Sequence, residues 1–221
     1  GQHYIYLSEI VSSGDGNLFT YMLMDSHGDY WLGGENGLIH IDGTAPYEAE
    51  WFRQDSDRYP LRHNHIRCIY EDSSNDIWIA SDGGVARYDR RKRAFDFYQV
   101  QVDGSGKNAN WAYSILEDRF GRIWIASYMG GLFICRKDNL EILHHFNEDS
   151  GIGLNVYLMQ DGGNDCIWAT CSNGLVSIDI NTLEVDGHDL YADNMICLDD
   201  HIWYSISGKL HRYDISEKKS T

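Results

Sequence analysis

The sequence predicts an all-β protein of the β-propeller class, built from four-stranded blades of which about five are present. The first observation is a repeat, because the segment from Ile115 to Ser127, ILEDRFGRIWIAS, recurs in shifted copies along most of the 221 residues. The second is the period, because successive copies place their tryptophans 47, 46, 44 and 35 residues apart. A period of about 40 to 50 residues is typical of propellers with one blade per repeat. The tryptophans are Trp31, Trp78, Trp124, Trp168 and Trp203.

Each repeat contains short apolar stretches separated by turn residues, the pattern of a four-stranded antiparallel unit. Residues 1–221 are expected to form a single propeller region, with blades at about 19–55, 66–101, 112–147, 156–190 and 195–215. We expect the last blade to be incomplete, with three strands, because the polar stretch from Ser216 to Thr221 shows no strand pattern. A lone strand at 4–10 belongs either to a preceding blade or to the fifth blade. In the second case it would supply the missing fourth strand and close a ring of five blades.

The hairpin between the first and second strands repeats the spacing Asp-x-x-Gly or Asp-x-x-Asn, beginning at Asp25, Asp72 and Asp118. A carboxylate at the start of a tight turn accepts backbone N–H bonds, and Gly or Asn tolerates a positive φ. The tryptophan that follows is a large plate suited to packing between blades. We therefore expect these aspartates and the five tryptophans to be structural. The hairpins before Trp168 and Trp203 differ in length and should differ in form.

The composition excludes several classes of function. The formal charge of −16, with 18 Lys plus Arg, argues against nucleic acid or an anionic membrane surface as a partner. No apolar run reaches the roughly 20 residues that span a bilayer, so direct membrane insertion is not expected. The first residues do not read as a signal peptide, so the chain is either cytosolic or has lost its signal. Five cysteines without a Cys-x-x-Cys pair indicate neither a disulfide framework nor a zinc site, and we expect no metal and no cofactor.

Signatures of enzymes are missing, and no residue is a candidate for catalysis. The segment from Asp103 to Lys107 ends in Asn108 rather than opening a helix, so it is not a phosphate-binding loop. Neither Gly-x-Ser-x-Gly nor His-Glu-x-x-His occurs. The acidic pairs Glu71-Asp72 and Glu117-Asp118 recur in the hairpins, which marks them as turn chemistry.

Binding is expected at the end of the blades where the longer loops gather, because long variable loops on a rigid scaffold usually carry function. Polar and aromatic residues meet there, a combination that sugar rings favour. The candidates are Arg62, His63, His65, Asn110, Trp111, Tyr128 and Met129. Two alternatives stay open, since Trp111 could seal the seam between blades and the two histidines could be solvated. The basic run from Arg90 to Arg93 lies at the opposite end and reads as a solvated turn.

The combined pattern, Ile-x-Glu-Asp-x-x-Gly-x-Ile-Trp-Ile-Ala-Ser-x-x-Gly-Leu-x-x-Tyr-Asp, resembles the two-component regulator propeller repeat over residues 19–214. That family is found in the extracytoplasmic sensor region of hybrid two-component proteins, chiefly of Bacteroidetes. In it, tandem seven-bladed propellers precede an immunoglobulin-like module, a membrane span and a histidine kinase. The resemblance implies a periplasmic location, a non-enzymatic fragment of a kinase-bearing receptor, and an open arc of a seven-bladed propeller rather than a closed ring of five.

The resemblance also implies a ligand and partners. It favours an oligosaccharide or another small ligand, whose binding changes the juxtaposition of two receptor chains. The remaining receptor blades, or a second copy of the chain, are expected to contact the arc, because unpaired sheet edges recruit partners. Two alternatives remain: a propeller enzyme acting on polysaccharide, as a lyase or esterase, and a protein-binding scaffold without a small ligand.

Overall fold

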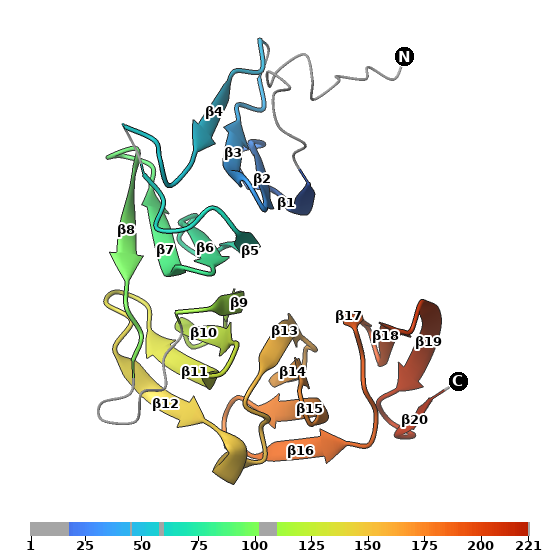
Figure 1. Ribbon diagram of the computed structural model, residues 1–221. Helices are drawn as coiled ribbons and strands as arrows, with labels where there is room; N and C mark the ends of the chain where they lie inside the picture. Colours follow the sequence, from blue (N-terminus) through green and yellow to red (C-terminus); the bar gives the residue numbers. More distant parts are fainter. Residues whose placement is uncertain (1–17, 45, 58–59, 102–109, 221) are drawn as a thin grey trace, which may run out of the picture. The chain divides into compact units, whose positions relative to one another are not determined.

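The structure, a computed structural model, describes residues 18–44, 46–57, 60–101 and 110–220 (Figure 1). These residues form five four-stranded antiparallel sheets, each with its strands in sequence order. The chain divides into two compact units, residues 1–97 and 98–221, which are described separately as unit 1 and unit 2. The described ranges contain one single-turn 3-10 helix, Glu148–Ser150, and no helix long and apolar enough to cross a membrane. The predicted fold class, all-β with four-stranded blades, is confirmed.

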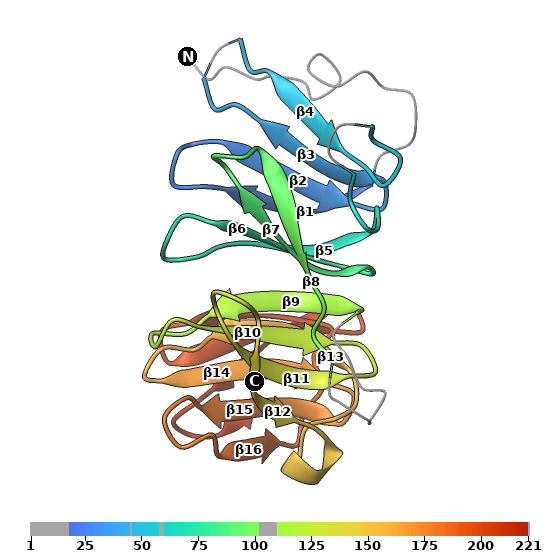
Figure 2. The ribbon, with the colours of Figure 1, turned by 90° about the vertical axis from the view of Figure 1, so that its left-hand side faces the viewer.

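Unit 1 contains the first two sheets. Figure 2 shows the strands of the first sheet lying side by side in chain order. The first sheet consists of β1 (Phe19–Met24), β2 (Tyr30–Gly34), β3 (Gly37–Ile41) and β4 (Ala49–Phe52). The second consists of β5 (Ile66–Glu71), β6 (Ile77–Ser81), β7 (Gly84–Asp89) and β8 (Ala94–Tyr98).

Unit 2 contains three sheets whose first strands lie together, with β13 in contact with both β9 and β17 (Figure 1). The third sheet consists of β9 (Ala112–Glu117), β10 (Arg122–Ser127), β11 (Gly131–Arg136) and β12 (Ile142–Phe146). The fourth consists of β13 (Val156–Asp161), β14 (Cys166–Cys171), β15 (Gly174–Asp179) and β16 (Val185–His188). The fifth consists of β17 (Asn194–Leu198), β18 (His201–Ile206), β19 (Lys209–Asp214) and β20 (Lys219–Ser220).

Within each unit, the tryptophan of one sheet is buried by the sheet that follows. Trp31 of the first sheet is fully buried in one cluster with Ile77 and Tyr88 of the second. Trp168 of the fourth sheet lies in a cluster with residues of the fifth, including Ile202. No sheet follows the fifth in the described part of unit 2, and Trp203 there is 37% exposed although it occupies the same position in its strand. Trp31 and Trp168 therefore each pack between two neighbouring sheets of their own unit.

Three of these tryptophans are held by a buried carboxylate. In the first three sheets, the indole Nε1–H donates to Oδ2 of the hairpin aspartate at 2.7 Å, and the aspartates are Asp25, Asp72 and Asp118. The other oxygen, Oδ1, accepts two backbone N–H bonds of the same hairpin, for Asp118 those of Phe120 and Arg122 at 2.9 and 3.0 Å. One side chain thus closes the turn and fixes the tryptophan, which explains the Asp-x-x-Gly/Asn spacing. The fourth and fifth hairpins differ, and Trp168 packs against Gly162, where a Cβ would lie 2.4 Å from the indole.

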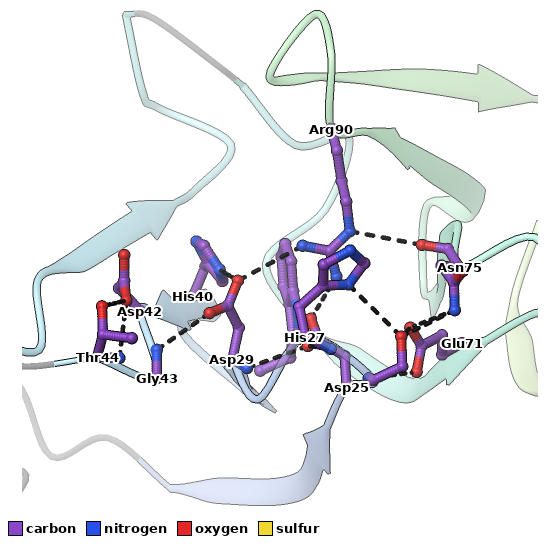
Figure 3. Close-up of polar contacts among 12 residues, drawn as sticks. Asp25, His27, Asp29, His40, Asp42, Gly43, Thr44, Glu71, Asn75 and Arg90 are labelled. Carbon is purple, nitrogen blue, oxygen red and sulfur yellow. Dashed lines mark hydrogen bonds and ion pairs between the residues drawn. The ribbon is translucent and has the colours of Figure 1, made fainter.

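Arg90 fastens the second sheet to the first (Figure 3). It lies in the hairpin after β7, and its guanidinium donates to the carboxylate of Asp25 and, at 3.5 Å, to Asp29. Its Nε also donates to the carbonyl of Asn75 at 3.4 Å. Arg93 of the same hairpin pairs with Glu50 of β4 at 3.0 Å. The expectation that this basic run is only a solvated turn is therefore wrong, because two of its arginines bind acids of the neighbouring sheet.

The hydroxyl and amide groups of the two hairpins in unit 1 add further bonds between the sheets. Ser26 donates from Oγ and from its backbone N–H to the Glu71 carboxylate, at 2.6 and 2.8 Å. The side-chain amide of Asn75 donates to the Ser26 hydroxyl at 2.8 Å. In unit 1, the hairpin acids Asp25 and Glu71 therefore bond to residues of the neighbouring sheet.

The fifth sheet corrects the sequence prediction, because it has a fourth strand, β20, formed by Lys219 and Ser220. The Asp214 carboxylate accepts from the backbone N–H of Glu217 and the hydroxyl of Ser216, which turns the chain back. The strand is short, polar and exposed, so it carries no apolar alternation to reveal it. The expected strand at 4–10 lies outside the described residues. That the blades form an open arc rather than a closed ring stays a prediction.

The carboxylate–indole bond should be a large contributor to stability. Trp124→Phe removes the donor to buried Asp118 and leaves a gap, so we expect it to lower the free energy of unfolding by about 2 to 4 kcal/mol. Trp203→Phe, at the same repeat position in the same unit, should cost under about 1 kcal/mol because Trp203 is part-exposed. Urea unfolding of both variants measures the difference, and equal losses would contradict this assignment.

Stability should also depend on pH through Asp25. Burial acts to raise the pKa of Asp25, but hydrogen bonds from Trp31 and Arg90 outweigh it and lower the pKa below its usual value. Because the folded pKa lies below the unfolded one of about 3.9, the stabilisation is present above that pH and is lost as the pH falls through the folded pKa.

The measurement compares the unfolding free energy of the wild type and Asp25→Asn between pH 7 and pH 3. We expect the variant to be less stable at neutral pH and the difference to shrink below about pH 4. Asp55→Asn, at an exposed aspartate of the same unit, is the matched control and should show no such convergence. A difference that stays constant with pH would contradict the role of the ionised carboxylate.

Candidate functional site

The candidate binding face lies at the end of the sheets opposite to the aspartate hairpins. There, in the first four sheets, the residue after the second strand donates its backbone N–H to the carbonyl of the residue before the first strand. In the third sheet Tyr128 donates to Trp111 at 2.9 Å, and in the second Asp82 donates to His65 at 3.2 Å. The equivalent pairs are Glu35 with Leu18 and Ser172 with Asn155. This bond holds two loop residues side by side at each position.

A β-bulge adds a third residue to each pair. In each of the first four sheets, the second residue of the first strand has no partner in the pairing with the second strand. These bulge residues are Thr20, Arg67, Tyr113 and Tyr157. A bulge bends a strand locally and re-aims a side chain, and bulges are frequent next to functional sites. We call the residue before the first strand, the bulge residue and the residue after the second strand a rim trio.

The rim trio of the second sheet is charged. Arg67 donates to both oxygens of Asp82, at 2.8 and 3.1 Å, and Nδ1 of His65 lies 3.1 Å from the same carboxylate. Burial acts to raise the pKa of Asp82, but the hydrogen bond and charge of Arg67 outweigh it and lower the pKa. The carboxylate therefore stays ionised at neutral pH and holds the guanidinium in a fixed place.

The rim trio of the third sheet is aromatic. The Trp111 and Tyr128 rings have centroids 5.3 Å apart, and Tyr113 stacks on Tyr128 at 5.9 Å. Tyr157, the bulge residue of the fourth sheet, meets Tyr113 edge-on at 5.9 Å. We call these four residues the aromatic rim. Trp111 is 48% exposed and Tyr157 is 38% exposed, so the rim presents ring surface to solvent.

The extra residue of the third repeat extends the aromatic rim. Met129 lies in the longer turn after β10, has a φ of 62° and is 56% exposed. Its backbone N–H donates to the side-chain carbonyl of Asn155 at 2.8 Å, a member of the next rim trio. This bond joins the turn after β10 to the loop before β13.

The structure places the sequence candidates in two groups, each in its own unit. In unit 2, Trp111, Tyr128 and Met129 come together and exposed Asn110 precedes them. In unit 1, His65 joins a rim trio, whereas Nδ1 of His63 accepts a bond from the backbone N–H of His65 at 3.1 Å.

Arg62 is exposed and its guanidinium lies 5.1 Å from the ring centroid of Phe97. A binding role for any of these seven candidates stays a prediction.

Sequence reasoning missed Arg67, Asp82, Tyr113 and Tyr157. A signal was present, because in each of the first four repeats the bulge residue lies 15 positions before the turn residue that it neighbours. The bulge residue and the turn residue form an ion pair in the second sheet and an aromatic pair in the third. The backbone pairing around them is the same in both sheets. Such variation at one end of a fixed frame is what a recognition surface requires.

Two cavities lie away from the aromatic rim, at the hairpin end of the sheets. A cavity of about 150 Å³ in unit 2 lies at the hairpin end, where Glu117, Asp118 and Asp165 contribute to its lining. A polar cavity of about 460 Å³ in unit 1 is lined by arginines and by Asp76 and Asp89, also at that end. Within the described ranges, no three His, Cys, Asp or Glu residues gather closely enough to hold a metal ion. The arrangement at the rim suits stacking and hydrogen bonding.

Comparison with solved structures gives the same fold. The chain is 32% identical to the extracellular domain of BT4673 from B. thetaiotaomicron, which its two structures name as a one component system and as a hybrid two component system. The TM-score is 0.88 in both, and the likeness covers 98% or 99% of this chain but 32% of that one. The chain thus spans about a third of the length of this relative.

More distant structures share the fold alone. The extracellular domain of BT3049 from the same organism is 17% identical with a TM-score of 0.75, over 94% of this chain and 30% of that one. Virginiamycin B lyase from Staphylococcus aureus is 16% identical with a TM-score of 0.69, over 95% of this chain and 70% of that one. No curated protein sequence matches the chain.

The family model described as two component regulator propeller matches residues 60–83 and 106–129. These ranges contain the first two strands of the second and third sheets. Together with the likeness to BT4673, which covers nearly the whole chain, this match identifies the repeats. The chain therefore contains two-component regulator propeller repeats at residues 60–83 and 106–129, the repeat that its sequence pattern resembles.

Proposed function

We propose that the chain is a ligand-binding part of the periplasmic sensor region of a hybrid two-component histidine kinase, and that its ligand is a neutral oligosaccharide. The likeness to extracellular domains of B. thetaiotaomicron supports the sensor role. The aromatic rim is the observation that carries the ligand class. Stacked, part-exposed rings beside amide and hydroxyl groups suit the apolar faces and hydroxyl edges of pyranose rings.

The chemistry of the aromatic rim favours a neutral sugar over an acidic one. The four ring residues and Met129 carry no formal charge at neutral pH, and the chain as a whole has a formal charge of −16. An anionic glycan would meet overall repulsion, without a basic residue in the third rim trio to offset it. The bulges of β9 and β13 place two tyrosines on strands rather than on loops, so the surface is held in place before a ligand arrives.

Binding rather than turnover is the proposed outcome. The aromatic rim presents rings, hydroxyls and an amide, and it does not pair a nucleophile with a general base. The alternative of a propeller lyase draws support from no more than a shared fold with lyases, such as virginiamycin B lyase at 16% identity. We propose that a bound glycan transmits its signal by changing how receptor chains lie against one another.

Calorimetric titration of the 221-residue chain with a panel of neutral and acidic oligosaccharides tests the proposal. We expect saturable binding of a neutral glycan, weakened at least tenfold by Trp111→Ala and by Tyr128→Ala, because each removes a stacking ring. Trp203→Ala is the matched control, since it removes a part-exposed tryptophan in the fifth sheet of the same unit and should bind normally.

Three results would contradict the proposal. Equal weakening by Trp203→Ala would show that the effect is on folding. Preference for acidic glycans would contradict the ligand class. Shortened or unsaturated sugars in the titrated samples, detected by mass spectrometry, would favour the propeller enzyme over the sensor.

A further inference from the structure

Cys166 and Cys197 both pack against the apolar cluster between the fourth and fifth sheets. Cys166 lies two residues before Trp168 on β14 and so shares its face, and Cys197 shares a face of β17 with Met195. Trp168 and Met195 belong to one buried cluster, and both cysteines pack against it. The two thiols therefore lie on the two sides of one packed interface within unit 2.

The two cysteines also lie at the same end of their sheets. Cys166 is the first residue of β14, directly after the hairpin that follows β13. Cys197 is the last residue but one of β17, directly before the hairpin that leads to β18. Because β13 and β17 are in contact as neighbouring first strands, these hairpins lie at the same end of unit 2.

The position of Cys166 is one that other repeats use to fasten neighbouring sheets. The residue two before the repeat tryptophan is Asp29 in the first sheet, and it pairs with Arg90 of the second sheet at 3.5 Å. In the third sheet it is Arg122, which donates to the carbonyl of Ile180 in the fourth sheet at 2.7 Å. In the fourth sheet it is Cys166, which packs against the same cluster as Cys197 of the fifth sheet.

Proximity also shows in the thiol electrostatics. Burial raises the pKa of Cys197 to about 12, and the neighbouring Cys166 thiol adds to the rise. Burial likewise raises the pKa of Cys166. Neutral buried thiols react slowly, so a bond between them would form during folding or with a catalyst and would then be protected.

We propose that Cys166 and Cys197 form a disulfide that joins the fourth and fifth sheets when the chain folds in the presence of a disulfide oxidant. With oxidised glutathione, one cysteine thiolate attacks the glutathione disulfide and releases one glutathione, leaving a mixed disulfide. The second cysteine thiolate then attacks the protein sulfur and releases the other glutathione. The two protein thiols are oxidised by two electrons, the glutathione disulfide is reduced to two thiols, and the proton count is balanced. This inference does not depend on the proposed ligand.

The test refolds the full chain in a buffer of reduced and oxidised glutathione, followed by alkylation of free thiols under denaturing conditions. We expect three free thiols out of five. No Lys or Arg separates the two cysteines, so trypsin leaves them in one peptide, whereas cleavage at Glu184 should yield two fragments joined until reduction. The oxidised form should melt roughly 5 to 15 °C above the reduced form.

Single substitutions supply the controls. Cys166→Ser and Cys197→Ser should each retain four free thiols, whereas Cys135→Ser should retain two because the proposed pair is intact. Five free thiols in the refolded wild type, a stable mixed disulfide with glutathione, or a bond from Cys166 to Cys171 would overturn the proposal. Since the first measurement uses the wild-type chain, it does not depend on whether any variant folds.

Discussion

The interaction on which the described sheets depend most is the buried hydrogen bond between a hairpin aspartate and the repeat tryptophan. At 2.7 Å in each of three sheets, it joins the turn at one end of the sheet to the repeat tryptophan, and in unit 1 the second sheet covers Trp31 of the first. An ionised carboxylate is costly to bury unless its oxygens are bonded, and here the indole and two turn amides satisfy them. The same side chain therefore determines where the hairpin bends and where the neighbouring sheet can pack.

The two ends of the sheets therefore differ in role: the hairpin end joins neighbouring sheets, and the opposite end presents side chains that vary between repeats. The hairpin end is rich in bonds between sheets, such as Arg90 to Asp25 and Arg122 to Ile180, which hold the repeats to one another. The opposite end keeps a constant backbone bond between its loops but varies its side chains from repeat to repeat. A rigid frame at one end allows the rim at the other to change without loss of the fold. The aromatic rim of the third and fourth sheets is one result of that freedom.

Part of the candidate site could be predicted from the sequence. Trp111 and Tyr128 stand out because the third repeat departs from the pattern around them. Tyr113 and Tyr157 read as ordinary strand residues, since strand alternation alone does not reveal that a bulge turns them toward the rim. The pairing of Arg67 with Asp82 depends on two strands brought together by a hairpin. The fourth strand of the fifth sheet was missed because an exposed edge strand of two polar residues has no apolar pattern.

The sequence by itself determined the number of repeats, the hairpin chemistry and the resemblance to two-component regulator propeller repeats, because these follow from spacings along the chain and from turns in which every partner lies within six residues. Only the tertiary structure decided which side chains meet across a seam. Arg90 reads as a solvated cation until a second sheet brings the Asp25 carboxylate to it. Cys166 and Cys197 read as unrelated strand residues until two sheets pack face to face. Contacts between repeats depend on the packing of whole sheets, and no local spacing encodes them.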